Sequence, residues 1–584
     1  MKDRAKSGGR RAAAAGVSAA ALVLGLAIAP VQAAPATANP AVSATAGSTG
    51  QLFGDYLAGR HAQHTRNFSA AARWYEKALA ADPRAPELIK HTFLMEISDG
   101  SFERAAALAK SELMRDPHDA LAQLTIVIER LKAGDSAGAL KAAEALPTDG
   151  LHRFVGPFAL AWTRAATGDI AGADTALQGL DKFNGFEPLK VFQLGLLYDY
   201  TGKPDLARQY FDKALAASQQ LNWRLVEVIA NFDRRHGRAD QAAKLFQRFS
   251  SQSSTGDLAL ALAAARPAGV PQPIVATPAD GLAEAMFDLA SVLDQSETID
   301  LALVYDRFAL DLQPQFPLAQ LLLGDILTAD GKPEQALSVL TGVKPDSPYY
   351  WSAQLRAAVD LDALGRSNEA IAQLRSMASK NSKLIGAEIE LGDILRNQKR
   401  FSEAASAYDE AIRREKAAGL PQRWILFYDR GVALERSGQW PRAEADLQHA
   451  LKLKPDQPTV LNYLGYSWVD RGRNLKHGLQ MIEKAVELRP DDGYIVDSLG
   501  WAHYRLGQYK DAVRYLEKAT ELVPEDPTIN DHLGDAYWQT GRLVEARYQW
   551  RRALQFGPQK DEIKPIEAKL QHGLSISAQP PGGG

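Results

Sequence analysis

The segment from Gly493 to Pro524 reads GYIVDSLGWAHYRLGQYKDAVRYLEKATELVP, and the segment from Pro527 to Pro558 reads PTINDHLGDAYWQTGRLVEARYQWRRALQFGP. Each has a glycine at its eighth position, and the same glycine recurs at spacings of 34, 35 and 34 residues: Gly431, Gly465, Gly500 and Gly534. The closing prolines recur at spacings of 35, 34 and 34: Pro455, Pro490, Pro524 and Pro558. Self-similarity at this period indicates an array of helix–turn–helix units.

Each recurring position has a physical reason. The glycine lies where the two helices of a unit cross closely, and a small residue meets it from the second helix: Ala443, Ala512 and Ala546. A further glycine ends the first helix in a conformation with positive φ: Gly438, Gly507 and Gly541. These features, in register over successive units, are typical of tetratricopeptide repeats.

The same frame continues upstream with weaker matches. We therefore expect an all-α, superhelical tetratricopeptide solenoid of roughly a dozen repeats, built in two segments. The expected organisation is a signal peptide over 1–33, a flexible linker over 34–50, a degenerate array over 51–249, a Pro- and Ser-rich linker or insertion over 250–280, a central array over 281–420, well-formed repeats over 421–558, and a capping helix with a disordered tail over 559–584.

The N-terminus has the pattern of a secretory signal peptide. Basic residues precede an uncharged, apolar stretch, Ala12–Ala29, and Val31 and Ala33 suit the −3 and −1 positions of a cleavage site. We therefore predict cleavage after Ala33 or Ala34 and an exported, periplasmic protein. The alternative is a retained N-terminal anchor, which is the one membrane attachment that we expect.

Composition excludes several classes of function. The formal charge is −3, with 67 basic and 70 acidic residues, so no basic surface for nucleic acid is expected. The chain has no cysteine, which excludes disulfides, thiolate nucleophiles and a lipidated N-terminal cysteine. His61 and His64 lack further ligands at metal-binding spacing. No catalytic or phosphate-binding motif occurs, and we expect no enzyme activity, metal, cofactor or small-molecule substrate.

The candidate binding surface is the concave side of the best-formed repeats. In a helix-pair solenoid this side is lined by the first helix of each pair. Helical periodicity, counted from each repeat glycine, selects these partner-binding residues: Tyr428, Asn462, Tyr466, Tyr494, Asp497, Trp501, Tyr504, Arg505, Asp531, Asp535 and Trp538. Aromatic groups beside hydrogen-bonding groups are typical of protein-binding hot spots. The alternative is that these aromatics only pack between helices.

The C-terminal repeats also resemble a known family. The phrases NYLGYSWVDRG, IEKAVELRPDDGYIVDSLGWAHYRLGQY and YLEKATELVPEDPTINDHLGDAYWQTGR, between Asn462 and Arg542, are similar to bacterial envelope adaptors. Those adaptors are outer-membrane lipoproteins that bind carboxyl-terminal processing proteases and deliver cell-wall hydrolases to them. The resemblance implies a non-catalytic adaptor whose partners are such a protease and such hydrolases. Because the lipid-accepting cysteine is missing here, lipid anchoring is not implied.

Two other readings remain open at this point. The first is a scaffold for polysaccharide secretion or cell-wall assembly, in which the aromatic surface meets a glycan or a synthase. The second is a glycosyltransferase that carries repeats at one end. The repeats leave no room for a separate catalytic domain, which disfavours the second reading.

Overall fold

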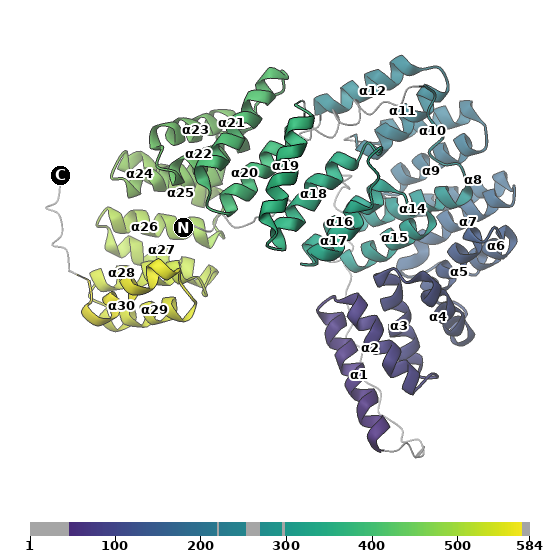
Figure 1. Ribbon diagram of the computed structural model, residues 1–584, viewed down its shortest axis with the longest axis horizontal. Coiled ribbons are helices and arrows are strands. Elements are labelled where there is room, and N and C mark those ends of the chain that lie inside the picture. The colour runs from purple at the N-terminus through teal and green to yellow at the C-terminus, as the bar shows by residue number, and fades with distance from the viewer. Residues whose placement is uncertain (1–45, 219–220, 253–268, 295–297, 383, 575–584) are drawn as a thin grey trace. The chain divides into compact units, whose positions relative to one another are not determined.

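The computed structural model describes residues 46–218, 221–252, 269–294, 298–382 and 384–574 (Figure 1). The predicted signal peptide, most of the predicted linker over 34–50, the centre of the Pro- and Ser-rich segment, and the predicted tail after residue 574 lie outside these ranges. Within them the secondary structure consists of 29 α-helices and two short 3₁₀ helices, with no strand. The predicted all-α class is confirmed.

The chain divides into two compact units between Ala370 and Ile371. The described helices of the N-terminal unit are α1 (Ala46–His64), α2 (Phe68–Ala81), α3 (Pro86–Asp99), α4 (Phe102–Arg115), α5 (Ala120–Lys132), α6 (Ser136–Glu144), η1 (Leu151–Phe154), α7 (Val155–Ala166), α8 (Ile170–Gln178), η2 (Gly179–Lys182), α9 (Glu187–Tyr200), α10 (Pro204–Ala217), α11 (Trp223–Arg235), α12 (Ala239–Gln252), α14 (Pro278–Leu293), α15 (Ile299–Leu312), α16 (Pro317–Ala329), α17 (Pro333–Thr341) and α18 (Tyr350–Ala363).

The helix α19 (Ser367–Lys380) contains the division between the units. The C-terminal unit continues with α20 (Gly386–Asn397), α21 (Phe401–Ala417), α22 (Trp424–Arg436), α23 (Trp440–Leu453), α24 (Pro458–Asp470), α25 (Leu475–Leu488), α26 (Gly493–Arg505), α27 (Tyr509–Leu522), α28 (Pro527–Gln539), α29 (Leu543–Gln555) and α30 (Lys560–His572). None of the described helices is both long and apolar enough to cross a membrane.

The repeat glycines act as the sequence predicts. A Cβ at Gly500 would lie 2.6 Å from Cγ of Leu516, and a Cβ at Gly534 would lie 2.5 Å from the Trp550 ring. Only glycine therefore allows the two helices of each pair to approach this closely. At the turns, φ is +76° at Gly507 and +81° at Gly541, so these residues supply the left-handed conformation that ends each first helix.

Side-chain caps fix where the first helices begin. Asp526 accepts hydrogen bonds from the backbone N–H groups of Thr528 and Ile529, at 2.8 and 3.1 Å. Pro527 occupies the first helical position, where its missing N–H costs nothing. Asp492 caps α26 in the same way, by accepting from Tyr494 and Ile495. A short acidic residue thus sets the register of each of these helices.

In the N-terminal unit the chain doubles back on itself. The helices α14 and α15 pack against α3, α5, α7 and α9, which are first helices of earlier pairs (Figure 1). Nε2 of Gln193 donates to Asp288 at 2.9 Å, and Nε of Arg307 donates to the carbonyl of Ser98 at 3.2 Å. Gly281 allows α14 to approach α7, because a Cβ there would lie 2.3 Å from the Trp162 ring. The chain's own helices therefore cover first helices that would otherwise line an open surface.

This interior contains buried charged groups. Arg224 of α11 forms an ion pair and hydrogen bonds with Glu284 of α14, which is fully buried. Asp306 of α15 is also fully buried, and neither of its carboxylate oxygens accepts a hydrogen bond among the described residues. Burial raises the pKa of Asp306 well above its ordinary value, and the nearby Arg307 opposes this only in part.

The predicted division at 250–280 falls inside the N-terminal unit. The helix α12 ends at Gln252 and α14 begins at Pro278, with a capping box between Thr277 and Asp280. The helices α14 and α15, which follow this segment, pack on the earlier helices and belong to the same compact unit.

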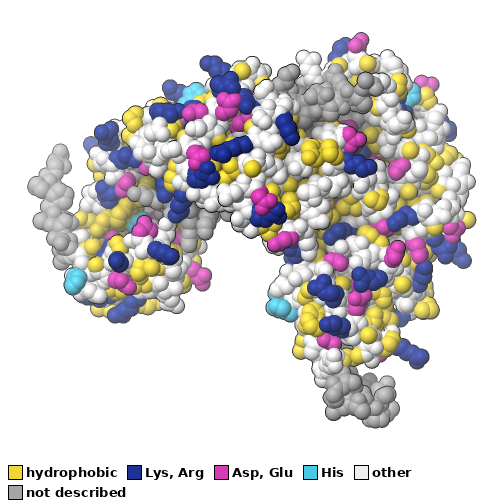
Figure 2. Space-filling view, in the orientation of Figure 1, with side chains coloured by type: hydrophobic (Ala, Val, Ile, Leu, Met, Phe, Trp, Pro, Cys, Tyr) yellow, Lys and Arg dark blue, Asp and Glu magenta, His cyan; other side chains and the backbone are white. Residues whose placement is uncertain are grey.

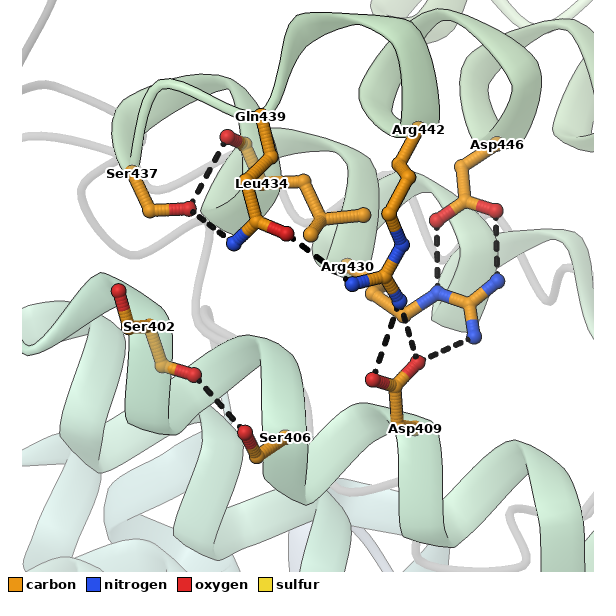
Figure 3. Close-up of polar contacts among 9 residues, drawn as sticks. All are labelled: Ser402, Ser406, Asp409, Arg430, Leu434, Ser437, Gln439, Arg442 and Asp446. Carbon is orange, nitrogen blue, oxygen red and sulfur yellow. Dashed lines mark hydrogen bonds and ion pairs between the residues drawn. The ribbon is translucent and has the colours of Figure 1, made fainter.

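In the C-terminal unit a charged network ties three successive helices together. Arg430 of α22 contacts Asp446 of α23 through Nε and Nη2, and Asp409 of α21 through Nη1 at 2.7 Å (Figure 3). Arg442 adds a second contact to Asp409 at 3.1 Å. A guanidinium presents several donors in a fixed plane, so Arg430 holds α21 and α23 at a defined separation.

Candidate protein-binding surface

The eleven predicted binding residues lie on four first helices of the C-terminal unit, α22, α24, α26 and α28. Their burial separates them into two groups. The exposed or half-buried group is Tyr466, Tyr494, Trp501, Tyr504, Arg505 and Asp531, and the buried group is Tyr428, Asn462, Asp497, Asp535 and Trp538. A partner that approaches the folded repeats can reach the first group directly.

The centre of the surface is a stack of aromatic rings. Trp501 lies parallel to Tyr504, with centroids 4.7 Å apart, and to His532 of the next first helix, with centroids 4.0 Å apart. Nδ1 of His532 is 2.9 Å from Oδ1 of Asp497. The buried Asp497 therefore orients His532, and the His532 ring stacks against the half-buried Trp501 and fixes its position.

His532 was not among the predicted binding residues. It lies two residues before Gly534, one position away from the helix face that the periodicity selected. The signal that could have found His532 is Asp497 in the preceding repeat. A buried carboxylate such as Asp497 needs a hydrogen-bond partner, and His532 is a suitable one. Its role in the structure is to position the stack.

Charged pairs border the aromatic rings. Nη1 of Arg505 donates to Oδ1 of Asp470 at 2.7 Å, and Arg471 donates to Glu435 at 2.8 Å. The helix that carries Asp470 also carries Tyr466, whose pKa is raised chiefly by burial and further by the carboxylates of Asp497 and Asp470. The tyrosine therefore stays protonated and can donate a hydrogen bond to a bound segment.

Two of the buried residues pack within the repeats. The ring of Tyr428 meets Tyr463 edge-on, with centroids 5.8 Å apart and planes at 84°. Asn462 is 5 % exposed, and its Oδ1 accepts no hydrogen bond among the described residues. Tyr428 thus serves packing, and Asn462 lies buried on the helix that carries the half-buried Tyr466.

The last helix, α30, closes the C-terminal end of the surface. Nζ of Lys569 lies 2.8 Å from both Asp531 and Asp535 of α28. Nε1 of Trp538 donates to the carbonyl of Leu574 at 2.6 Å, and Trp538 is only 7 % exposed. Trp538 and Asp535 were predicted to face a partner, but the cap covers them, because α30 follows α28 in the position of a further first helix.

The chemistry of the surface is that of aromatic rings, hydrogen-bond donors and ion pairs. Among the described residues no group of three or more His, Asp or Glu side chains is placed to hold a metal ion. On the face visible in Figure 2, basic and acidic side chains are interspersed. The arrangement can stack planar groups, donate hydrogen bonds and exchange ion-pair partners, which are binding operations.

Comparisons with known proteins agree with the repeat assignment. A family model described as tetratricopeptide repeat matches residues 192–257, 389–458, 428–492 and 498–561. TPR repeat-containing protein PA4667 of Pseudomonas aeruginosa is 30 % identical over 194 residues, which are 33 % of this chain and 32 % of that protein. Superkiller complex protein 3 of Mus musculus is 32 % identical over 113 residues, which are 19 % of this chain and 7 % of that protein.

The chain thus matches a third or less of the length of these relatives. Among solved structures, the Cut9–Hcn1 hetero-tetramer of the APC/C aligns with 90 % of this chain and 96 % of that chain, at 14 % identity and a TM-score of 0.39. The matched segments of the family model lie in both compact units and coincide with helix pairs that cross at the predicted glycines. The chain therefore carries tetratricopeptide repeats, a fold whose members bind proteins or peptides.

Proposed function

We propose that this chain is a non-catalytic adaptor or scaffold of the bacterial cell envelope. In this proposal a segment of a partner protein binds the aromatic face, which we define as Tyr466, Tyr494, Trp501, Tyr504 and Arg505. The observation that carries the proposal is the parallel stack of the half-buried Trp501 and Tyr504 on a first helix of well-formed repeats.

The chemistry of this face suits a protein partner. Tyrosine, tryptophan and arginine are the residues that contribute most to protein-binding hot spots. They are already held by neighbours, Trp501 by His532 and Arg505 by Asp470, so little side-chain entropy is lost on binding. Charge matters less here, because Arg505 already has a carboxylate partner.

The C-terminal unit is the better candidate for this role. In the N-terminal unit, α14 and α15 cover the first helices α3, α5, α7 and α9. In the C-terminal unit, Tyr494 remains 39 % exposed and Arg505 is exposed. A partner segment can therefore reach the aromatic face without displacing a helix of the chain.

The location and the partners are inferred from the N-terminal pattern and from the family resemblance. Export to the periplasm follows from the basic and apolar sequence before Ala34. The resemblance to envelope adaptors favours a carboxyl-terminal processing protease and cell-wall hydrolases as partners. The given residues contain no cysteine, so the proposal does not include the lipid anchor of those adaptors.

Quantitative pull-down from an envelope extract tests this proposal. The bait is the mature chain, compared with Trp501→Ala and with Lys484→Ala, which removes an exposed side chain from the second helix α25. We expect a protease or cell-wall hydrolase to be enriched by the wild type and by Lys484→Ala, and to be lost with Trp501→Ala. Recovery of no envelope protease or hydrolase would count against the adaptor role.

A second function is favoured by the same stack. Planar aromatic rings also bind the faces of sugar rings, so a scaffold for polysaccharide secretion or cell-wall assembly would use Trp501 and Tyr504 as well. Binding of the purified chain to a glycan array, abolished by Trp501→Ala and kept in Lys484→Ala, would favour this alternative over a protein partner.

A further inference from the structure

The second helix of the last repeat, α29, exposes apolar side chains on its outer side. Val544 is 79 % exposed and Tyr548 is 57 % exposed, the highest values among the described large apolar side chains of the C-terminal unit. They lie one helical turn apart, and Arg551 and Arg552 follow on the next turn. We call Leu543, Val544, Tyr548, Arg551 and Arg552 the α29 patch.

The same positions differ in the two preceding repeats. Aligned on Ala512 and Ala546, the residues that match Val544, Tyr548 and Arg551 are charged or carry an amide: Lys510, Arg514 and Glu517 on α27, and Lys476, Gln480 and Glu483 on α25. A solvent-facing position of a repeat has no packing reason to become apolar, and exposed Val and Tyr are costly in water. The last repeat therefore departs from the two preceding repeats at exposed positions, where a partner could cover the apolar side chains.

The side chain of Arg552, one of the two arginines of the patch, is held by its neighbours. Nη2 of Arg552 donates to the carbonyl of Pro524 at 2.8 Å, and its guanidinium lies 5.3 Å from the Phe556 ring and 6.0 Å from the Tyr548 ring. Arg551 is exposed. The nearest acidic residue of the helix, Glu545, is paired with Arg542 at 3.0 Å, so it does not neutralise the two arginines.

The charge of the patch restricts what can cover it. A symmetric contact between the patches of two copies would bring four arginines, Arg551 and Arg552 from each copy, into one interface, and like charges repel. The chain's own terminal segments are poor in acidic side chains: residues 575–584 contain none, and residues 1–45 contain one acidic and five basic residues. An acidic partner satisfies both the arginines and, through its own apolar groups, Val544 and Tyr548.

We propose that the α29 patch docks an acidic segment of another protein, with carboxylates on Arg551 and Arg552 and an apolar side chain on Val544 and Tyr548. This surface belongs to a second helix, whereas the aromatic face lies on first helices. It is thus a second binding surface of the chain, and it does not depend on what the aromatic face binds.

Fluorescence anisotropy with the purified full chain tests the proposal. The probes are a panel of short labelled peptides that place Glu beside Leu or Phe at varied spacings, each with a counterpart in which Gln replaces Glu. We expect acidic peptides to bind more tightly than their Gln counterparts, and the binding to weaken as salt is added. Reversal of one charge, Arg551→Glu, should weaken the binding by roughly tenfold.

Further variants separate the patch from the rest of the surface. The double change Val544→Gln and Tyr548→Gln, which removes the apolar side chains without changing the charge of the patch, should also weaken binding by roughly tenfold. Arg514→Glu on α27 is the matched control and should bind as the wild type does, and so should Trp501→Ala on the aromatic face. Circular dichroism of each variant checks that the helices are intact.

Several outcomes would overturn the proposal. The first is equal binding of acidic peptides and their Gln counterparts, or no binding of any peptide. The second is unchanged affinity in both patch variants. The third is Arg551-dependent binding to vesicles of phosphatidylglycerol and phosphatidylcholine that exceeds binding to every peptide, which would assign the patch to a lipid surface. The fourth is a concentration-dependent dimer in analytical ultracentrifugation that the double variant abolishes.

Discussion

The guanidinium of Arg430 on α22 donates two parallel hydrogen bonds to the carboxylate of Asp446 on α23, each 2.6 Å long. Asp446 is 8 % exposed, so its negative charge has little contact with water. A bidentate pair of this kind compensates a buried carboxylate better than one contact can. The pair fixes the geometry of a helix hairpin that precedes the aromatic face.

Replacing Arg430 should therefore destabilise the C-terminal unit. Arg430→Met keeps an unbranched side chain but leaves Asp446 buried without its partner, and we expect a loss of about 2–4 kcal/mol in the free energy of unfolding. Arg442→Met is the matched control: Arg442 is 53 % exposed, and its contact with Asp409 should contribute less than about 1 kcal/mol. Urea titration measures both, and equal losses would contradict this account.

The buried Asp306 predicts an unusual pH dependence for the N-terminal unit. Its pKa in the folded chain lies well above the ordinary value, chiefly because of burial, so the folded form holds a proton that the unfolded chain releases. This group's contribution to stability is full at pH values below about 4 and is lost as the pH rises toward the folded pKa.

The substitution Asp306→Asn tests this linkage. It removes the titration while keeping the size of the side chain, so the variant should be more stable than the wild type at pH 8, by about 1–3 kcal/mol, and should lose less stability between pH 5 and pH 8. The exposed Asp205 provides the control, since Asp205→Asn should leave the pH profile unchanged. The prediction fails when the profiles of Asp306→Asn and wild type coincide in chemical denaturation.

The cap α30 should depend on Lys569 and on pH. Burial, and then the charge of Asp531, raise the pKa of Asp535 to about 6, and Lys569 opposes the rise. Because the folded pKa is raised, the stability that protonated Asp535 contributes is lost as the pH rises through about 6, and Lys569 reduces this loss. Below pH 6 a proton on Asp535 makes the cation less necessary.

We therefore expect Lys569→Met to loosen α30 strongly at pH 8 and weakly at pH 5. Hydrogen–deuterium exchange, expressed as protection factors for residues 560–572, should show a decrease of about tenfold at pH 8. Lys564→Met, at an exposed position of the same helix, should change nothing at either pH. A defect of equal size at pH 5 and pH 8 would show that Lys569 acts by packing rather than by charge.

Local features of the fold could be predicted from the sequence because each repeat contains its own signals. The glycine spacing predicted the helix crossings, and the side chain that lies closest to Gly500 is Leu516 of the second helix rather than the predicted Ala512. The turn glycines have the predicted positive φ. The helical period also selected Trp501 and Tyr504, which the structure finds half-buried and stacked.

Contacts between distant segments were not predictable in this way. The doubling back of the N-terminal unit rests on pairs such as Gln193 and Asp288, which are 95 residues apart and have no periodic signature. The burial of Trp538 comes from the carbonyl of Leu574, 36 residues later. Periodicity within one helix shows which face a side chain occupies, but not which later helix covers that face.

The central claim is that partners bind the aromatic face, and site-specific photo-crosslinking in cells of the native host tests it most directly. A photo-reactive amino acid at Tyr494, which is 39 % exposed and lies on the same helix as Trp501, is compared with the same group at the exposed Lys484 on α25. The account predicts a discrete protein adduct from position 494, absent from position 484 and lost when Trp501→Ala is added. Adducts of equal yield at the two positions, or none at position 494, would contradict it.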